Sequence, residues 1–285
     1  MIDVADLVFT YPGAPSPTLK GITFGVTAGE VFGFLGPSGA GKSTTQKLLI
    51  GLNGGYEGRA EVLGREARAW GTALYRQIGV GFELPNHFSQ LTGLENLKLF
   101  ASLHDGETRD PMALLDRLGI ADAANTRVKS YSKGMAMRLN FARAILHSPR
   151  LLFLDEPTAG LDPANARNLK DIIRELKAAG TTIFLTTHDM HDANELCDRV
   201  AFIVDGELAL VDSPRALALA HGEPRVTVEH RGADGTLRRD QFELRGLGDD
   251  PAFAEILRAD AIETLHSGEA TLEDIFIATT GRRLS

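Results

Sequence analysis

The sequence predicts an α/β fold built on a mainly parallel sheet, followed by a small α+β appendage. Three observations predict it. Strand-like and helix-like segments alternate over about the first 200 residues. Two short apolar runs, "RLLFLDE" and "TTIFLTT", are typical of strands buried on both faces of a parallel sheet. After about residue 222 the segments become short and mixed, which predicts domains at 1–221 and 222–285.

Composition limits the classes of protein to consider. The 285-residue chain is 43% hydrophobic and 24% charged, which suits one large domain and a smaller one. Its formal net charge is -8 and it has no dense block of Lys and Arg, so no nucleic-acid partner is expected. The single cysteine, Cys197, excludes an internal disulfide and fits a reducing compartment. We interpret it as a small apolar residue on a packed helix.

No segment predicts a membrane span or an export signal. The N-terminal stretch "MIDVADLVF" contains acidic residues and lacks a basic region followed by an apolar one. No apolar run approaches the roughly 18 residues that are needed to span a bilayer. If the protein acts at a membrane, we expect another polypeptide to supply the membrane part.

The first part of the chain predicts strands and then helices. "IDVADLVFTY", "LKGITFGVT" and "EVFGFLG" are strand-like and are separated by turns rich in Pro and Gly. A helix is expected from Lys42 to about Leu52, because its leucines fall on one face. "RAEVLG" and "RQIGVGF" predict further strands. Thr92 and Glu95 form a capping-box signature that opens another helix, and the segment from about 84 to 147 is expected to be mainly helical.

The second part alternates in the same way. Asp162 and Pro163 predict the N-cap and the first residue of a helix that ends at Gly180. "RVAFIVDGELALVD" predicts a hairpin across Asp205–Gly206. The appendage is expected to consist of the segments "PRVTVEH", "GTLRRDQFEL", "PAFAEILRA", "AIETLHS" and "TLEDIFIATTG".

The stretch "GPSGAGKST" predicts a phosphate-binding loop. It fits the pattern G-x-x-x-x-G-K-[ST], and it lies between the strand "VFGFL" and a helix, as the motif requires. Gly39 and Gly41 let backbone N–H groups approach phosphates without a clash at Cβ. Lys42 is expected to reach the β- and γ-phosphates, and Ser43 to ligate Mg²⁺. The nucleotide-binding residues predicted here are Gly36, Pro37, Ser38, Gly39, Ala40, Gly41, Lys42, Ser43 and Thr44.

Two adjacent acids end the apolar run "LLFLDEP", at the edge of the sheet where ligands of open α/β folds bind. Asp155 is expected to hold Mg²⁺ through its water shell. Glu156 is expected to orient or deprotonate the attacking water, a role worth roughly 10²–10⁴ in rate. Alone, the two acids would also suit the cap of a turn before Pro157. His188 ends the next strand and could bond a γ-phosphate or the attacking water, although a single histidine at a strand end is usually structural.

Five motifs occur in the order GPSGAGKST, YSKGM, LLFLDEP, AGLDP and TTHDM, and in this order they resemble the ATP-binding cassette (ABC) ATPases. The resemblance covers about residues 1–215 and implies a phosphate-loop NTPase core with an antiparallel β subdomain and a helical subdomain. It implies that Tyr11 stacks on adenine, although Tyr11 also suits an ordinary strand end. Asp162, also a helix N-cap, resembles the residue that couples the two halves of a cassette dimer.

The segment "YSKGM" occupies the place of the family's Leu-Ser-Gly-Gly-Gln signature. Ser132 and Gly134 match it, whereas Tyr131, Lys133 and Met135 differ. The resemblance implies that two cassettes pack head to tail, and that each closes this loop over the ATP that the other holds. Ser132 could instead serve only as the N-cap of its own helix.

A further departure concerns Glu83 in "RQIGVGFELPNHF", where the family usually has Gln. The resemblance implies that this residue touches Mg²⁺ or the attacking water and relays to the membrane subunit. A carboxylate can ligate Mg²⁺, but when ionised it cannot donate a hydrogen bond.

The resemblance implies the ATP-hydrolysing motor subunit of an ABC transporter, with ATP and Mg²⁺ as cofactors. Its partners would be a second copy of the chain and a separate transmembrane permease at the cytoplasmic face of the membrane. The tail "ATLEDIFIATTGRR" and the variant signature resemble bacterial drug, lipid and polysaccharide exporters, which favours export. The alternatives are a soluble cassette ATPase acting on nucleic acid or ribosomes, and a phosphate-loop kinase or GTPase, which would give "YSKGM" and His188 no role.

Overall fold

The structure, a computed structural model, describes residues 1–222, 225–232, 234–259, 261–268 and 270–282. Within these ranges the chain forms two compact units, Met1–Ser213 and Pro214–Arg282. The sequence places the domain boundary after residue 221. In the structure the boundary lies before the helix α7 (Pro214–His221), which belongs to the second unit. None of the described helices is long and apolar enough to cross a lipid bilayer.

The first unit is built on a mainly parallel sheet, as the sequence predicts. Its strand order is β10-β9-β3-β8-β7-β6, with parallel pairing throughout except between β9 and β10. All described residues of β3, β7 and β8 are buried, because each strand is a short apolar run covered on both faces. The strands are β3 (Val31–Leu35), β6 (Ile78–Gly81), β7 (Leu151–Asp155), β8 (Thr182–Thr187), β9 (Arg199–Val204) and β10 (Glu207–Asp212).

The predicted hairpin between β9 and β10 turns at Asp205 and Gly206, whose φ angles are 50° and 81°. Positive φ at both central residues is what a tight two-residue hairpin requires, and it is the reason for the Asp-Gly pair.

A second, antiparallel sheet packs against the first and confirms the predicted antiparallel β subdomain. Its order is β2-β1-β4-β5. The core between the sheets contains a cluster of phenylalanines, in which the ring of Phe24 lies 5.2 Å from that of Phe34, and Phe34 lies 5.5 Å from Phe184. The strands are β1 (Ile2–Phe9), β2 (Leu19–Val26), β4 (Glu57–Val62) and β5 (Arg65–Glu66).

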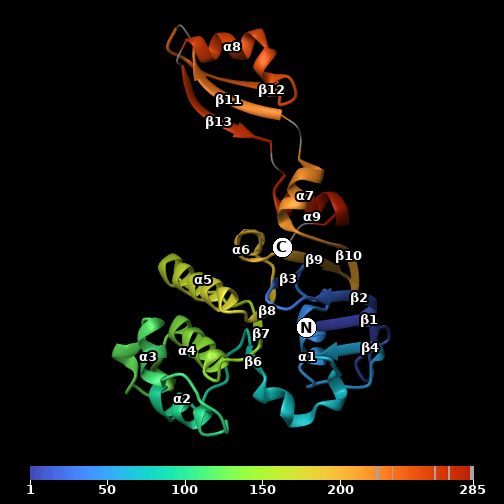
Figure 1. The fold of residues 1–285 in the computed structure, drawn as a ribbon, viewed down its shortest axis with the longest axis vertical. Coiled ribbons are helices and arrows are strands. Elements are labelled where there is room, and N and C mark those ends of the chain that lie inside the picture. The colour runs from blue at the N-terminus through green and yellow to red at the C-terminus, as the bar shows by residue number, and fades with distance from the viewer. Residues whose placement is uncertain (223–224, 233, 260, 269, 283–285) are drawn as a thin grey trace. The chain divides into compact units, whose positions relative to one another are not determined.

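The segment from 84 to 147 is mainly helical, as expected. The helices α2 (Gly93–Ala101), α3 (Pro111–Arg117) and α4 (Lys133–Ile145) pack on one another, and α4 also packs against β6 (Figure 1). The Thr92 capping box is present: the Thr92 hydroxyl accepts from the Glu95 amide at 3.2 Å, and Glu95 accepts from the Thr92 amide at 2.8 Å. Short 3₁₀ turns lie at Ala67–Ala69, Gly71–Arg76, Ala121–Ala123 and Val128–Ser130.

Three more helices complete this unit. α1 (Lys42–Leu49) ends before the predicted Leu52, because Gly51 adopts a φ of 74° and turns the chain out of the helix. α5 (Pro163–Ala178) begins at the predicted Asp162 cap. α6 (Met190–Leu196) packs against α5 and β3. Cys197 is buried at the end of α6, where burial raises the pKa of its thiol.

The second unit confirms the predicted α+β character of the appendage. A sheet in the order β12-β11-β13 packs its apolar residues against α8 (Pro251–Arg258), with Val226, Val228 and Phe253 in the core. α7 packs on α9 (Leu272–Thr280). Pro224, in the predicted strand "PRVTVEH", and Arg283, in the tail motif, lie outside the described residues. The strands are β11 (Arg225–Arg231), β12 (Leu237–Glu243) and β13 (Ile262–Ser267), and a 3₁₀ turn lies at Leu247–Asp249.

Candidate nucleotide-binding site

The loop between β3 and α1 needs its glycines for backbone conformation and for space. Gly39 and Gly41 have φ angles of 81° and 111°, in the region that L-residues avoid. A Cβ added to Gly36 would lie 2.1 Å from the carbonyl oxygen of Ile203, so no side chain fits there. The loop therefore runs close to the end of β9 and opens its backbone N–H groups toward the start of α1, the arrangement that binds phosphates.

Lys42 is the first residue of α1, and its ammonium group lies within the loop. Its Nζ donates to the carbonyl oxygens of Gly36 at 2.6 Å and Pro37 at 3.1 Å. Burial lowers the pKa of Lys42, and the nearby charges of Glu156, Asp155 and Glu83 oppose that shift. An ammonium group has three N–H donors, so one remains for a phosphate oxygen while the two carbonyls fix its position.

Ser43 and Asp155 lie next to each other although they are far apart in the sequence. The Ser43 hydroxyl donates to Asp155 Oδ2 at 3.2 Å, and the Thr186 hydroxyl donates to the other carboxylate oxygen. Mg²⁺ prefers oxygen ligands and usually takes one or two carboxylates together with nucleotide phosphates. The Ser43 hydroxyl at the start of α1 and the Asp155 carboxylate at the end of β7 fit such an ion.

Glu156 is held rigidly at the end of β7. Its φ is 48°, a strained value for a residue with a side chain, and such strain is concentrated at functional sites. Its Oε1 accepts from the backbone N–H of His188 at 2.9 Å and lies 2.7 Å from His188 Nδ1. Its Oε2 accepts from the Thr187 hydroxyl at 3.0 Å. The end of β8 thus sets the direction of the carboxylate, while the His188 side chain remains 61% exposed and reachable.

One cavity of about 280 Å³ brings most of the predicted residues together. Tyr11 lies beside it, because its hydroxyl is 3.2 Å from the Thr44 hydroxyl and its ring packs edge-on against Phe9. The cavity also includes Ala159, which the sequence analysis did not predict. The lining residues are Ser38, Gly39, Gly41, Lys42, Ser43, Thr44, Glu83, Asp155, Glu156, Ala159 and His188.

Thr186 and Thr187 were also missed, although each holds one of the two acids. A signal was present: both are hydroxyl residues at the end of "TTIFLTTH", directly after the apolar and buried residues of the strand. Buried hydroxyls need hydrogen-bond partners, and the adjacent strand end supplies the carboxylates.

Ser132, Gly134 and Asp162 do not line this cavity. Ser132 is exposed and accepts from the Met135 amide at 3.2 Å, so it caps α4. A Cβ on Gly134 would lie 3.5 Å from the Leu161 side chain, which places the start of α4 beside the loop that precedes α5. Asp162 caps α5, and its hydrogen bonds, chiefly to Asn165, lower the pKa of its carboxyl. Ser132 and Asp162 are exposed and Gly134 is half-buried, and we refer to these three residues as the solvent-facing cluster.

Tyr131, one of the departures from the signature, has a packing role. Its hydroxyl donates to the carbonyl oxygen of Ala123 at 2.8 Å. A Cβ on Gly93 would lie 2.1 Å from the same hydroxyl, so the tyrosine fills the space left by this glycine. Tyr131 thereby ties the start of α4 to the start of α2.

Comparisons with known proteins identify the family. Residues 19–159 match the family model described as "ABC transporter". A fluoroquinolone export ATP-binding protein of Mycobacterium tuberculosis is 58% identical over all of this chain and 95% of its own length. The chain belongs to the ATP-binding subunits of ABC transporters. A daunorubicin/doxorubicin resistance ATP-binding protein of Streptomyces peucetius is 35% identical over 98% of this chain and 92% of that protein.

Solved ABC cassettes have the same fold. The structure of an ATP-binding subunit of an ABC transporter matches with a TM-score of 0.71 and 28% identity, over 77% of this chain and 92% of that one. A bacterial ABC transporter cassette solved as a dimer matches with a TM-score of 0.67 and 25% identity, over 75% and 98%. Residues 224–269 match the family model described as "Fluoroquinolone efflux ABC transporter C-terminal domain". As an ABC subunit, the chain binds and hydrolyses ATP, and subunits of this family act with transmembrane components.

Proposed function

We propose that this ABC ATPase hydrolyses MgATP in the 280 Å³ cavity and drives a separate permease that exports drugs. The observation that supports it most is the placement of Glu156. A single cavity contains the phosphate loop, the Ser43–Asp155 pair and a carboxylate whose direction is set by Thr187 and His188. This arrangement matches what in-line attack of water on a γ-phosphate requires.

In this proposal each side chain has one task. The backbone N–H groups of the loop and Lys42 bind the β- and γ-phosphates, and Tyr11 lies where it can stack on adenine. Glu156 orients the water and takes its proton as the new P–O bond forms and the bond to the β-phosphate oxygen breaks, which yields ADP and phosphate. His188, fixed through Nδ1 by Glu156, offers Nε2 to the γ-phosphate. Ser43, Asp155 and Glu83 would hold Mg²⁺, which supplies charge neutralisation for the phosphates when bound.

The second part of the proposal is a homodimer that closes around two ATP. The exposed cluster at Ser132, Gly134 and Asp162 presents a hydroxyl and a helix N-terminus that its own chain's cavity does not use. Hydrogen bonds to a charged phosphate are worth roughly 1.5–3 kcal/mol each, so two such contacts per dimer would make closure depend on ATP. A related cassette has been solved as a dimer, which supports this arrangement.

The third part concerns the permease, which places the protein at the cytoplasmic face of the membrane. The segment from about 84 to 110 borders a groove of about 860 Å³. Phe88, 54% exposed, and Leu103, 65% exposed, line the groove, and Leu84, 78% exposed, belongs to the same segment of the chain. Such exposure is typical of an interaction site. We propose that cytoplasmic helices of the permease occupy this groove.

The proposed cargo is a fluoroquinolone-like drug. It is supported by the 58% identity to a fluoroquinolone export subunit over the full chain, and by the match of residues 224–269 to a C-terminal domain found in such systems. We propose that residues 222–285 form an accessory domain of the transporter, in addition to the ATP-binding domain at 1–221.

The test uses inside-out membrane vesicles that contain this chain together with a candidate permease. ATP-dependent uptake of a fluoroquinolone, absent with Lys42→Ala, is the expected result. Uptake of daunorubicin instead would reassign the cargo. Crosslinks from residues 84–110 should reach cytoplasmic helices of the permease, and crosslinks confined to residues 222–285 would refute that docking site. Co-purification of the chain with ribosomes instead of a permease would favour the soluble alternative.

A further inference from the structure

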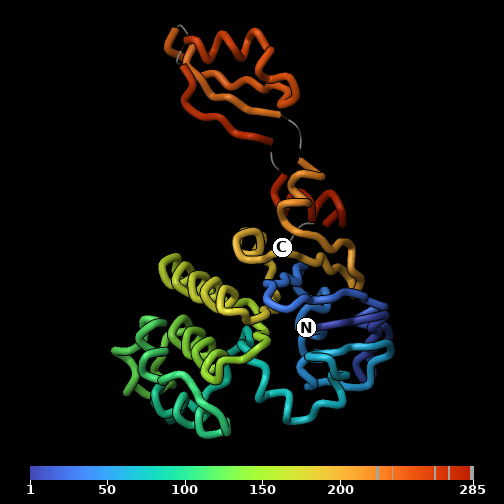
Figure 2. The backbone as a smooth tube through the Cα atoms, in the orientation of Figure 1, coloured from blue at the N-terminus to red at the C-terminus, as the bar shows by residue number. Residues whose placement is uncertain are grey.

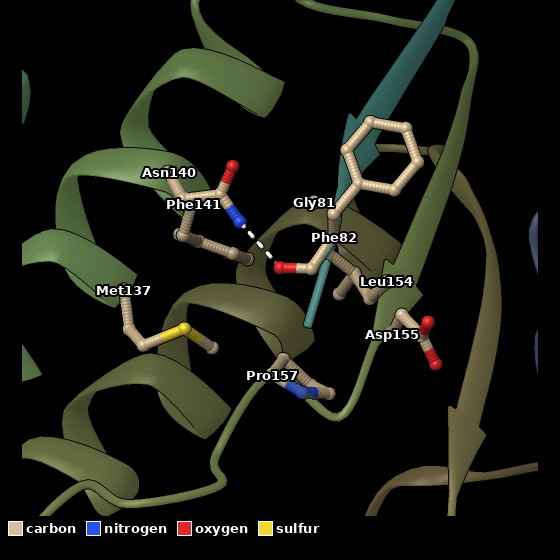
Figure 3. A pocket seen from close by; sticks show the side chains of 8 residues that line it. All are labelled: Gly81, Phe82, Met137, Asn140, Phe141, Leu154, Asp155 and Pro157. Carbon is tan, nitrogen blue, oxygen red and sulfur yellow. Dashed lines mark hydrogen bonds between the residues drawn. The ribbon is translucent and has the colours of Figure 1, made fainter. Parts of the chain in front are cut away.

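The loop between β6 and α2 is fastened to α4 at its start and near its middle, and Figure 3 shows the contact at its start. Its path from the sheet to the helices can be followed in Figure 2. Asn140 on α4 donates from Nδ2 to the carbonyl oxygen of Phe82 at 2.8 Å, just past the end of β6. Arg143, one turn later, donates to the carbonyl oxygen of Asn86 at 2.7 Å. His87 Nε2 lies 2.9 Å from the carbonyl oxygen of Ala136.

The side-chain amide of Asn140 has a hydrogen-bond partner at its nitrogen and at its oxygen. It is only 2% exposed, and its Oδ1 accepts from Arg143 Nη2 at 2.8 Å, so its amide orientation is determined. The Arg143 guanidinium lies 4.8 Å from the centre of the Phe100 ring, which anchors it in turn to α2. A buried amide whose nitrogen and oxygen both have partners resists rotation, because rotation would leave a polar atom unsatisfied.

α4 also lies unusually close to β6. A Cβ on Gly79 would be 2.0 Å from the carbonyl oxygen of Ala144, so the strand approaches the helix backbone directly. The strand and the helix are therefore packed backbone against backbone, and the Asn140 amide continues this contact one residue beyond the strand.

The residue after Phe82 is Glu83, which lines the nucleotide cavity. We propose that Asn140 is a positioning residue for Glu83: its bond to the Phe82 carbonyl sets where the Glu83 carboxylate stands in the cavity. Because Ser132 caps the start of α4, the same helix links the solvent-facing cluster to the cavity of its own chain. The inference rests on the proposed role of Glu83 in hydrolysis.

The substitution Asn140→Asp tests this bond with little change of shape. A carboxylate keeps its hydrogen bond to Arg143 but has no donor for the Phe82 carbonyl, and the two oxygens repel each other. Loss of alignment at a reacting centre costs about 10²-fold in rate. We expect kcat to fall by that order while the Kd for ATP changes little.

Asn96 provides a matched control at the far end of the same segment. It is also an Asn, 1% exposed, and its Nδ2 donates to the carbonyl oxygens of Phe88 at 3.1 Å and Thr92 at 2.9 Å. Asn96→Asp makes the same chemical change away from Glu83. We expect both substitutions to lower the midpoint temperature of unfolding. Only Asn140→Asp should cause the large loss of kcat per folded molecule.

A double-mutant cycle distinguishes positioning from general stability. The measurements are kcat and the Mg²⁺ concentration for half-maximal turnover in the wild type, Asn140→Asp, Glu83→Ala and the double variant. If Asn140 acts through Glu83, adding Asn140→Asp to Glu83→Ala changes kcat by no more than about twofold. Should Asn140→Asp not fold, Asn140→Ser, which is too short to reach Phe82, takes its place.

Each result decides between the two proposals. Losses that multiply in the double variant would overturn the positioning role and leave the role of Glu83 intact. Wild-type turnover in Glu83→Ala would overturn both, because Asn140 would have nothing to position. Equal kcat losses in Asn96→Asp and Asn140→Asp would reduce Asn140 to a packing residue.

Discussion

Glu156→Gln is the most informative single change at the catalytic cavity. It keeps the size and shape of the side chain and removes its charge and its basicity. General-base catalysis contributes roughly 10²–10⁴ in rate, so kcat should fall by that factor. This corresponds to about 3–5 kcal/mol of transition-state stabilisation.

The structure indicates that the folded state tolerates the change. The amide oxygen of Gln can replace Oε1 and accept from the His188 N–H, while the new NH₂ group faces the Thr187 hydroxyl. That hydroxyl already accepts from the Asp189 amide at 2.9 Å, and its second lone pair can accept from the NH₂ group. Exchanging charge-assisted bonds for neutral ones weakens each by about 1 kcal/mol. The kinetic loss should therefore exceed the loss of stability.

The assay measures equilibrium binding of a fluorescent ATP analogue and steady-state phosphate release on the same preparation. We expect ATP affinity to be unchanged or higher, because a negative charge near the γ-phosphate is removed. Glu30→Gln is the matched control, since Glu30 is equally buried at 8% exposed but lies outside the cavity. Turnover of folded Glu156→Gln within about tenfold of the wild type would contradict this assignment, and Glu83 would become the first candidate for the base.

Three other predictions follow from the described contacts. Lys42→Ala should weaken ATP binding by at least about 10²-fold, because charged hydrogen bonds to phosphate are lost. Lys47→Ala, which changes an exposed residue of the same helix, should leave ATP binding unchanged. Equal losses of ATP affinity when both variants are titrated with ATP would refute the role of Lys42. Ser132→Arg should leave ATP binding to the monomer unchanged yet block dimer closure and hydrolysis. Mixed with the Lys42→Ala chain, it should give dimers with one intact composite site. If the Ser132→Arg protein alone forms ATP-driven dimers with wild-type turnover, Ser132 is a helix cap only. Burial, with the adjacent charge of His104, lowers the pKa of His147 to about 4. As the pH falls, this histidine is therefore protonated in the unfolded chain before it is protonated in the folded one. The free energy of unfolding should fall between about pH 6.5 and pH 4. In urea titrations at pH 7 and pH 5, His147→Gln should lose less stability between the two pH values than the wild type does. The same pH dependence of stability in both proteins would contradict the role of His147.

The sequence by itself determined the fold class, the family and the position of the phosphate loop. Glycine spacing and short apolar runs are local signals, and β3, β7 and β8 follow them directly. The Thr92 capping box and the Asp205–Gly206 hairpin were predictable for the same reason, since each depends on residues that are neighbours in the chain. The end of α1 was less predictable, because the leucine pattern continues past the residue where Gly51 turns the chain.

Only the tertiary structure decided which residues meet. Thr186 and Thr187 hold the two acids across adjacent strands, a pairing set by the register of β7 with β8. The Asn140 bond to Phe82 joins residues separated by 58 positions, and its presence depends on α4 packing against β6. Glu83 reaches the cavity, whereas Ser132 and Asp162 face solvent elsewhere. Such contacts follow from sheet order and helix packing, which minimise the free energy of the whole core and leave no periodic signal in the sequence.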